Sequence, residues 1–243
     1  MQKMAGTKTI LLLGFLLNLF FSQAQIITSG RIVFERKTNL EKKFSDDRMA
    51  DWLDGKKFKV EEFELFFNDT ISIFRPIESD AVDRMSWMTS KSTVMQNFTE
   101  NEKLTVLDVG GQQVILKDSN ALRQWKITDN KRTIDKYRCQ KAVYEKNDST
   151  RIYAWFTIDI VPSVGPEGFF GLPGAILGLA TEDGGIIYFA KKVEFNEPKA
   201  EIFAVNTKKK DIFTPEEFKA KMQKDFGSDE WSQRWMNDLF RWL

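Results

Sequence analysis

The sequence of 243 residues contains no histidine and a single cysteine, Cys139. Without histidine there is no imidazole, the side chain that most often serves as general base near neutral pH and as a metal ligand. Hydrolase triads and zinc sites that depend on histidine are therefore excluded. A lone thiol cannot form a disulfide within the chain. We expect no catalytic residues, no metal site and no cofactor, and a fold stabilised by its core.

Excess charge of either sign is also lacking, because 36 basic residues nearly balance 35 acidic residues and leave a formal net charge of +1. A chain with this balance has no overall field that would attract nucleic acid or an anionic bilayer. We therefore expect no nucleic-acid partner. Any recognition of a partner must come from local groups of residues.

The first residues have the pattern of a secretory signal. Lys3 and Lys8 precede a mostly apolar run over residues 10–21, and the small residues Ser22 and Ala24 follow. This order predicts a signal peptide over residues 1–24, with cleavage before Gln25. A transmembrane span needs roughly 20 apolar residues, and this run is shorter. No cysteine stands near the cleavage point, so we expect a periplasmic or secreted protein that is not a lipoprotein and has no transmembrane segment after cleavage.

The remainder, residues 25–243, has the length of one domain, and alternating apolar and polar residues dominate it. The alternation is clearest over residues 152–160. Short turns rich in glycine, asparagine and aspartate separate the expected strands, which favours an antiparallel meander. We expect a mainly β (α+β) fold with a large curved antiparallel sheet, in the form of an open half-barrel. The other expected strands cover residues 30–36, 63–67, 70–74, 104–109, 113–117, 122–128, 137–144, 175–180, 186–195 and 200–205.

Helices are expected mainly at the end of the chain, over about residues 215–242. Thr214, Pro215 and Glu217 provide a hydroxyl cap, a proline at the first helical position and a capping box. Gly227 ends this helix, and a second one begins after Ser228. The second helix carries an apolar stripe that includes Trp231, Trp235 and Trp242. The stripe must pack on its own sheet, on a partner or on a bilayer, and we favour its own sheet. A short helix over residues 46–53 is a further prediction.

A loop over residues 165–174 stands out because glycine recurs at every third position and proline occurs twice. Glycine allows a positive φ and close approach of the backbone, whereas proline fixes φ and removes a donor. We name this loop the arch. It is either a structural connection whose apolar side chains enter the core, or a binding loop. Together with the three tryptophans, the candidate ligand- or partner-binding residues are Gly165, Pro166, Phe169, Phe170, Gly171, Leu172, Pro173, Gly174, Trp231, Trp235 and Trp242.

The end of the arch resembles a family motif. Residues 171–177 read Gly-Leu-Pro-Gly-Ala-Ile-Leu, which is similar to the motif that names the GLPGLI family of exported Bacteroidetes-type proteins, with Ala175 in place of leucine. Further segments that resemble the family lie at residues 63–70, 125–129, 139–142, 165–167 and 189–194. The resemblance implies a periplasmic or outer-membrane-associated setting, sometimes beside TonB-dependent receptor genes. It implies no reaction and no catalytic residues.

These observations favour a non-enzymatic cell-envelope protein that binds an apolar ligand or an outer-membrane protein, such as a TonB-dependent receptor. A hydrolase that uses two carboxylates across one cleft is the alternative from another class. A purely structural envelope component is a third. Cys139 lies next to Arg138, which could lower the pKa of the thiol, but a lone strand cysteine is more often a small buried residue.

The signal-peptide prediction has a direct test. We expect the exported protein to begin at Gln25, because signal peptidase cleaves after small residues such as Ala24. Mass spectrometry of the intact protein from its native host measures the first residue. A mature protein that retains Met1 would contradict export through this signal.

Overall fold

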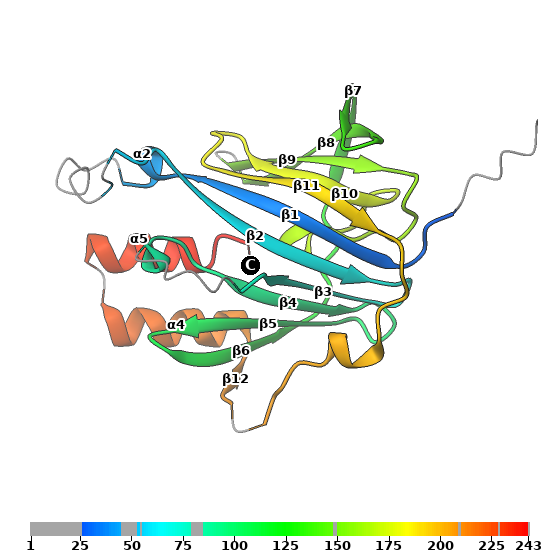
Figure 1. Ribbon diagram of the computed structural model, residues 1–243. Coiled ribbons are helices and arrows are strands. Elements are labelled where there is room, and N and C mark those ends of the chain that lie inside the picture. Colours follow the sequence, from blue (N-terminus) through cyan, green and yellow to red (C-terminus); the bar gives the residue numbers. More distant parts are fainter. Residues whose placement is uncertain are drawn as a thin grey trace, which may run out of the picture.

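The structure of the protein is a computed structural model (Figure 1). It describes residues 26–44, 53, 55–78, 85–147, 150–208, 210–227 and 229–242. The expected signal peptide and nearly all of the expected helix over residues 46–53 lie outside these ranges, so both stay predictions. No helix in the described ranges is long and apolar enough to span a membrane.

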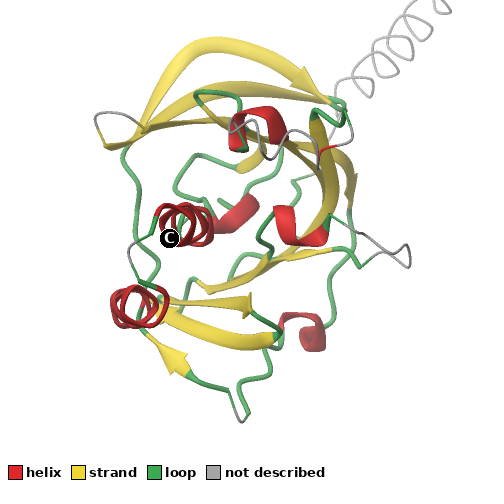
Figure 2. Cartoon of the chain, turned by 90° about the vertical axis from the view of Figure 1, so that its left-hand side faces the viewer, coloured by secondary structure: helices red, strands yellow, loops and turns green. Residues whose placement is uncertain are grey.

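A single mixed sheet of twelve strands dominates the described residues, and it does not close on itself. The strands are β1 (Gly30–Asn39), β2 (Phe58–Phe67), β3 (Ile71–Pro76), β4 (Ser92–Asn97), β5 (Glu102–Val109), β6 (Gln112–Asp118), β7 (Trp125–Ile134), β8 (Tyr137–Asn147), β9 (Thr150–Thr157), β10 (Ala175–Thr181), β11 (Ile186–Glu194) and β12 (Ile212–Phe213). Their order across the sheet is β12-β6-β5-β4-β3-β2-β1-β11-β10-β9-β8-β7. Figure 2 shows the strands curving around loops and the end of the chain.

Strand β1 joins two antiparallel meanders. From β1 the first meander proceeds strand by strand to β6, and the second leads from β7 back to β11, which pairs with the other side of β1. Only β12 breaks the antiparallel pattern among the strand pairs of the described residues, because it pairs in parallel with β6. The expected mainly β fold with a large antiparallel sheet and two helices near the C-terminus is confirmed.

Three local predictions were wrong. β4 was not expected, since consecutive residues Val94, Met95 and Gln96 are all buried and leave no alternation to detect. Residues 200–205 contain the 3-10 helix η5 (Ala200–Phe203) instead of a strand, with Phe203 anchored in a small cluster beside the sheet. The expected strand over residues 122–128 begins only at Trp125 and continues to Ile134 as β7, whose register with β8 shifts between Ile127 and Lys131.

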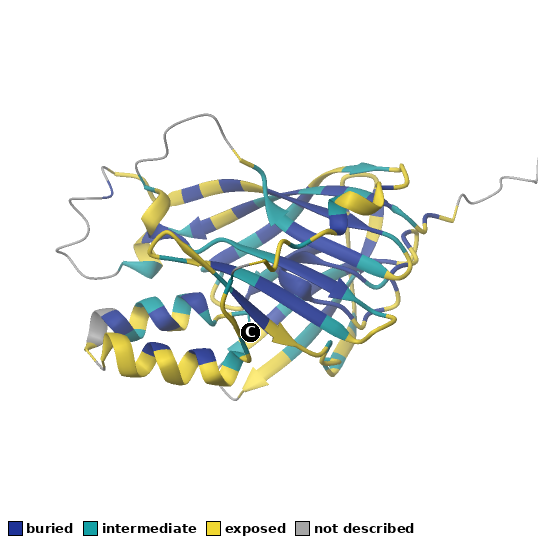
Figure 3. Ribbon diagram, turned by 90° about the horizontal axis from the view of Figure 1, so that it is seen from below, coloured by how far each residue is buried: buried dark blue, intermediate teal, exposed yellow. Residues whose placement is uncertain are grey.

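The helices pack mainly against one end of the sheet. They are α2 (Leu40–Lys43), α4 (Pro215–Phe226) and α5 (Glu230–Leu239), with short 3-10 helices η3 (Ser86–Met88) and η4 (Pro166–Gly168) besides η5. The expected capping box of α4 is present, and Gly227 ends the helix with φ +76°. Phe218 of α4 and Leu239 of α5 share a buried cluster with Leu107 of β5. Figure 3 shows buried residues on the strands and on one side of these helices.

The main core fills the curve of the sheet with aromatic side chains. Phe63 and Phe74 stack with ring centroids 5.1 Å apart, and Tyr188 meets both rings edge-on. Cys139 is buried in the same core, and burial raises the pKa of its thiol to about 11. The interpretation of Cys139 as a small buried residue is therefore confirmed, and a reactive thiolate is not.

Close approach of the backbone fixes the end of the arch. A Cβ atom at Gly174 would lie 2.0 Å from the carbonyl oxygen of Thr157 and 2.9 Å from that of Ile160. Gly174 also has φ +139°, which side chains rarely allow. Phe169 and Leu172 of the arch are buried in the main core. The arch is thus a built part of the fold, as the structural interpretation expects.

The arch can be tested by substituting two glycines that differ in their surroundings. We expect Gly184→Ala to cost about 1–2 kcal/mol, because Gly184 has a positive φ but open space around it. Gly174→Ala should cost more than about 3 kcal/mol, since the new methyl group meets two carbonyl oxygens. Chemical unfolding of the two variants measures the difference. Equal costs would show that crowding does not fix the arch.

Candidate functional site

The connection between the two edges of the sheet holds the arch inside the curve. Residues 119–124 lead from β6 at one side of the sheet to β7 at the other edge. Arg123 Nη1 donates to the carbonyl oxygen of Gly168 at 3.1 Å, and Trp125 Nε1 donates to that of Phe170 at 2.9 Å. Two carbonyl groups of the arch are therefore bound by side chains from a distant part of the sequence.

The end of the chain reaches the same place. After α5 the chain carries Trp242 onto Phe169 of the arch, with ring centroids 5.7 Å apart and nearly perpendicular planes. Trp242 also contacts Tyr188 of β11 at 6.3 Å. Edge-to-face pairs of this kind are favourable beyond their buried area. The arch and the tryptophan stripe, predicted as separate candidate sites, thus meet through Phe169 and Trp242.

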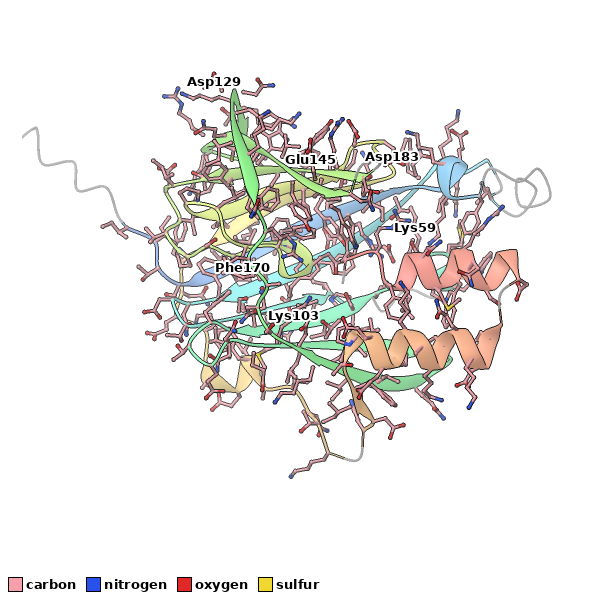
Figure 4. All side chains as sticks on the ribbon, turned by 180° about the vertical axis from the view of Figure 1, so that it is seen from behind. Lys59, Lys103, Asp129, Glu145, Phe170 and Asp183 are labelled. Atoms are coloured by element: carbon pink, nitrogen blue, oxygen red, sulfur yellow. The ribbon has the colours of Figure 1, made fainter. Side chains whose placement is uncertain are left out.

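A pocket with a cavity volume of about 170 Å³ lies where the connection, the arch and the chain end converge. Among the residues that line it, Leu122 and Phe170 contribute apolar surface, whereas Lys103 and Arg123 contribute positive charge. Figure 4 shows Phe170 and Lys103 near each other in the interior. The full lining is Gln96, Lys103, Asp118, Ser119, Ala121, Leu122, Arg123, Tyr144, Lys146, Ile152, Gly168, Phe169, Phe170, Arg241 and Trp242. We name it the arch pocket.

The arch pocket is positively charged. Burial lowers the pKa of Lys103, and the charge of Arg123 lowers it further. Burial also lowers the pKa of Arg123. The guanidinium carbon of Arg123 lies 4.1 Å from the centre of the Phe169 ring, a cation–π contact that positions the charge beside the arch. The pocket therefore combines aromatic walls with basic side chains, a composition suited to an anionic or amphiphilic molecule.

A second polar group lies deeper in the curve, around Glu167 of the arch. Glu167 is 2% exposed and has a left-handed φ of +55°. Its carboxylate accepts hydrogen bonds from the hydroxyl groups of Tyr188 and, at 2.9 Å, Ser92. Burial raises the pKa of Glu167 above its ordinary value of 4.5 despite the nearby Arg36. The arch thus inserts an acid into the core at a point where two hydroxyl groups bind it.

Arg36 offsets the negative charge of Glu167 only in part, because Arg36 already forms an ion pair with Glu61. Its Nη2 atom lies 2.5 Å from Glu61 Oε2, and both side chains are buried. Lys59 and Lys91 each place an ammonium 3.4 Å from the same carboxylate. Burial alone would raise the pKa of Glu61, but Arg36 and the two lysines together hold it below its ordinary value.

The sequence-predicted site residues divide between core, pocket and surface. Phe169 and Phe170 line the arch pocket, and Trp242 joins them. Trp235 packs against Phe226 at 5.2 Å beside the cluster that joins α4 and α5 to the sheet. The side chain of Trp231 lies outside the described part of the chain. The buried positions among the remaining arch residues are Gly165, Pro166, Leu172 and Gly174, and the exposed ones are Gly171 and Pro173.

Sequence reasoning missed the basic residues of the pocket. Lys103 gave one usable signal, because it shares a strand face with Leu107, whose side chain is buried. Arg123 gave none, since the sequence assigned it to the expected strand over residues 122–128, whereas it lies in the connection before β7, whose course depends on the whole sheet. In the described residues no group of histidine, cysteine, aspartate and glutamate side chains could hold a metal ion.

Comparison with known families gives one local match. The model of a family described as a protein of unknown function (Porph_ging) matches residues 145–178. This segment includes β9 and the arch and extends into β10. A comparison with curated proteins gives no match.

Comparison with solved structures gives a likeness of fold. A structure of PNGF-II in a C2 space group matches with a TM-score of 0.53 and 15% identity, covering 79% of this chain and 32% of that chain. A second PNGF-II structure gives 0.52 and 14% with the same coverage. This chain therefore spans about a third of the PNGF-II chain. An uncharacterised conserved protein from Thermus thermophilus matches with a TM-score of 0.40 and 7% identity, covering 76% and 91% of the two chains.

The two buried glutamates should affect stability with opposite dependence on pH. Glu167 has a raised pKa, so its contribution is fully present below about pH 4.5 and is lost as pH rises through the folded-state pKa. Glu61 has a lowered pKa, so its contribution is present above about pH 4.5 and is lost as pH falls through the folded-state pKa.

We therefore expect Glu167→Gln to gain stability relative to the unsubstituted protein between pH 4 and pH 8, since about 1.4 kcal/mol accompanies each unit of pKa shift. Glu61→Gln should lose stability over the same interval. Urea unfolding at a series of pH values measures both slopes. Parallel slopes for the two variants would contradict the assignment of charge in this network.

Proposed function

We propose that the protein is a non-enzymatic binding protein whose arch pocket receives an apolar ligand. The pocket is the observation that carries this proposal: aromatic side chains from the arch and the chain end line a hollow of about 170 Å³. Leu122 lines this pocket, and 77% of its surface is exposed. An exposed leucine at a concave surface gains contacts when a ligand covers it.

We place this binding protein in the cell envelope. The signal-like start of the sequence and the resemblance to the GLPGLI family over residues 171–177 support export to the periplasm of a Bacteroidetes-type bacterium. The family match over residues 145–178 falls on the same segment of the chain. An outer-membrane protein, such as a TonB-dependent receptor, is the proposed source or recipient of the ligand.

A hydrolase that uses carboxylates alone stays the alternative, and one observation favours it. Glu167 and Asp238 line one small pocket of about 20 Å³ beside Trp242. Each carboxylate, however, is occupied: Asp238 Oδ2 lies 2.6 Å from Lys43 Nζ, and Glu167 accepts from two hydroxyl groups. Because a general acid or base must reach its substrate, we rank ligand binding first.

The proposal predicts binding of a neutral apolar probe, N-phenyl-1-naphthylamine, whose fluorescence rises when it leaves water. Leu122→Ser should weaken binding of the probe by about three- to tenfold, because it removes apolar contact surface from the pocket. Fluorescence titration of the purified protein measures the dissociation constants.

Ile158→Ser is the matched control, since Ile158 is 70% exposed and does not line the arch pocket. This variant should bind the probe like the unsubstituted protein, and both variants should unfold at unchanged temperature. If the unsubstituted protein gives no fluorescence rise, the proposed function is wrong. Equal weakening by both substitutions would place the bound probe elsewhere.

A further inference from the structure

Lys103 of β5 is buried without an ionic partner. Only 6% of its surface is exposed, yet no hydrogen bond or ion pair to its ammonium occurs within the described residues. Asp118 is its register partner on β6, but the two side chains do not form an ion pair. A buried charge is costly unless it is paired or hydrogen-bonded. The Lys103 ammonium is not one of the fully buried polar atoms without a partner in the described residues, because it reaches the arch pocket, where an anion can approach it.

Two other lysines that lie inside the curve form ion pairs with acidic side chains of the protein. Lys59 is 7% exposed and lies 3.4 Å from a Glu61 carboxylate oxygen. Lys43 lies 2.6 Å from an Asp238 carboxylate oxygen. Lys103 is the exception among these three inward lysines, and it is the one that lines the arch pocket.

Basic side chains outnumber acidic ones in the lining of the arch pocket around Lys103. Arg123 lowers the pKa of Lys103, as does Lys146 to a smaller extent, and Arg241 also lines the pocket. Asp118 and Glu167 act in the opposite direction. Glu167 is bound to Tyr188 and Ser92, so it is not available to approach Lys103. Like charges gathered in one pocket favour a bound anion.

Arg123 is positioned to bind the same anion as Lys103. Its Nη1 donates to the Gly168 carbonyl oxygen, and its guanidinium lies against the Phe169 ring. The guanidinium carries five N–H donors, so further donors stay available after this bond. A planar guanidinium binds carboxylate and phosphate oxygens in pairs, and a nearby ammonium adds a point charge.

We infer that the arch pocket binds an amphiphile by its anionic head, a carboxylate or a phosphate held between Lys103 and Arg123. The apolar part of the molecule lies against Phe170 and Leu122, which line the same pocket. This inference deepens the proposed function and rests on it, because it names the class of ligand that the pocket takes.

The test compares three ligands that share an eight-carbon chain: octanoate, octyl phosphate and 1-octanol. Isothermal titration calorimetry of the full-length protein should show both anionic ligands binding at least about tenfold more tightly than the alcohol, as expected for charge-assisted hydrogen bonds. Inorganic phosphate alone should bind more weakly than octyl phosphate. The relative affinity of octanoate and octyl phosphate distinguishes a carboxylate head from a phosphate head.

Lys103→Met should remove the preference for the anionic ligands and leave the affinity for 1-octanol unchanged. Lys117→Met is the matched control. Lys117 lies on the neighbouring strand β6, forms an ion pair with Glu102 and does not line the arch pocket. This variant should keep the preference. The unfolding temperature of Lys103→Met without ligand should be equal to or above that of the unsubstituted protein, since a mostly buried side chain loses a charge that forms no ion pair.

The results test the anionic head of the ligand separately from the proposed binding function. Equal binding of all three eight-carbon ligands by the unsubstituted protein overturns the anionic head and leaves the proposed function standing. Absence of binding by every ligand overturns both. Inorganic phosphate that binds as well as octyl phosphate overturns the amphiphile. The comparison among ligands needs no variant, so a Lys103→Met protein that fails to fold does not remove the test.

Discussion

An open curved sheet cannot fill its own concave face, and the rest of this structure depends on that constraint. Twelve strands among the described residues form one sheet with edges at β12 and β7. Apolar side chains that point into the curve must be covered, because leaving them in water forgoes roughly 25 cal/mol for each square ångström. Three irregular segments supply the cover: the connection at residues 119–124, the arch and the end of the chain after α5.

Irregular segments bring backbone groups into the interior that strands would have paired. The carbonyl oxygens of Gly168 and Phe170 therefore take side-chain donors from Arg123 and Trp125. Each such side chain brings charge or a polar edge with it, so the interior is polar where the covering segments meet. The arch pocket and its positive charge lie where the three segments meet.

The sequence predicted what depends on neighbouring residues and missed what depends on the whole sheet. Alternation identified most strands, and Thr214 with Glu217 identified the start of α4, because these signals are local. The arch was recognised from its glycines and prolines, and Gly174 shows why glycine is needed there. Arg123 could not be placed, because a residue in the connection at residues 119–124 reaches the arch only after the two meanders join through β1. Trp242 was assigned to a helical stripe, yet it follows α5 and packs on the arch.

The sequence left two interpretations of the arch open, a structural connection and a binding loop. The positions of the arch residues make the two interpretations compatible. Phe169 is 3% exposed and belongs to the main core, while its ring also supports the Arg123 guanidinium at the pocket. Gly174 fixes the path of the backbone a few residues later. A binding group held by a rigid core keeps its geometry before the ligand arrives, which lowers the entropy lost on binding. The arch therefore combines both roles: crowding at Gly174 fixes its backbone, and Gly168 and Phe169 hold the Arg123 guanidinium at the pocket.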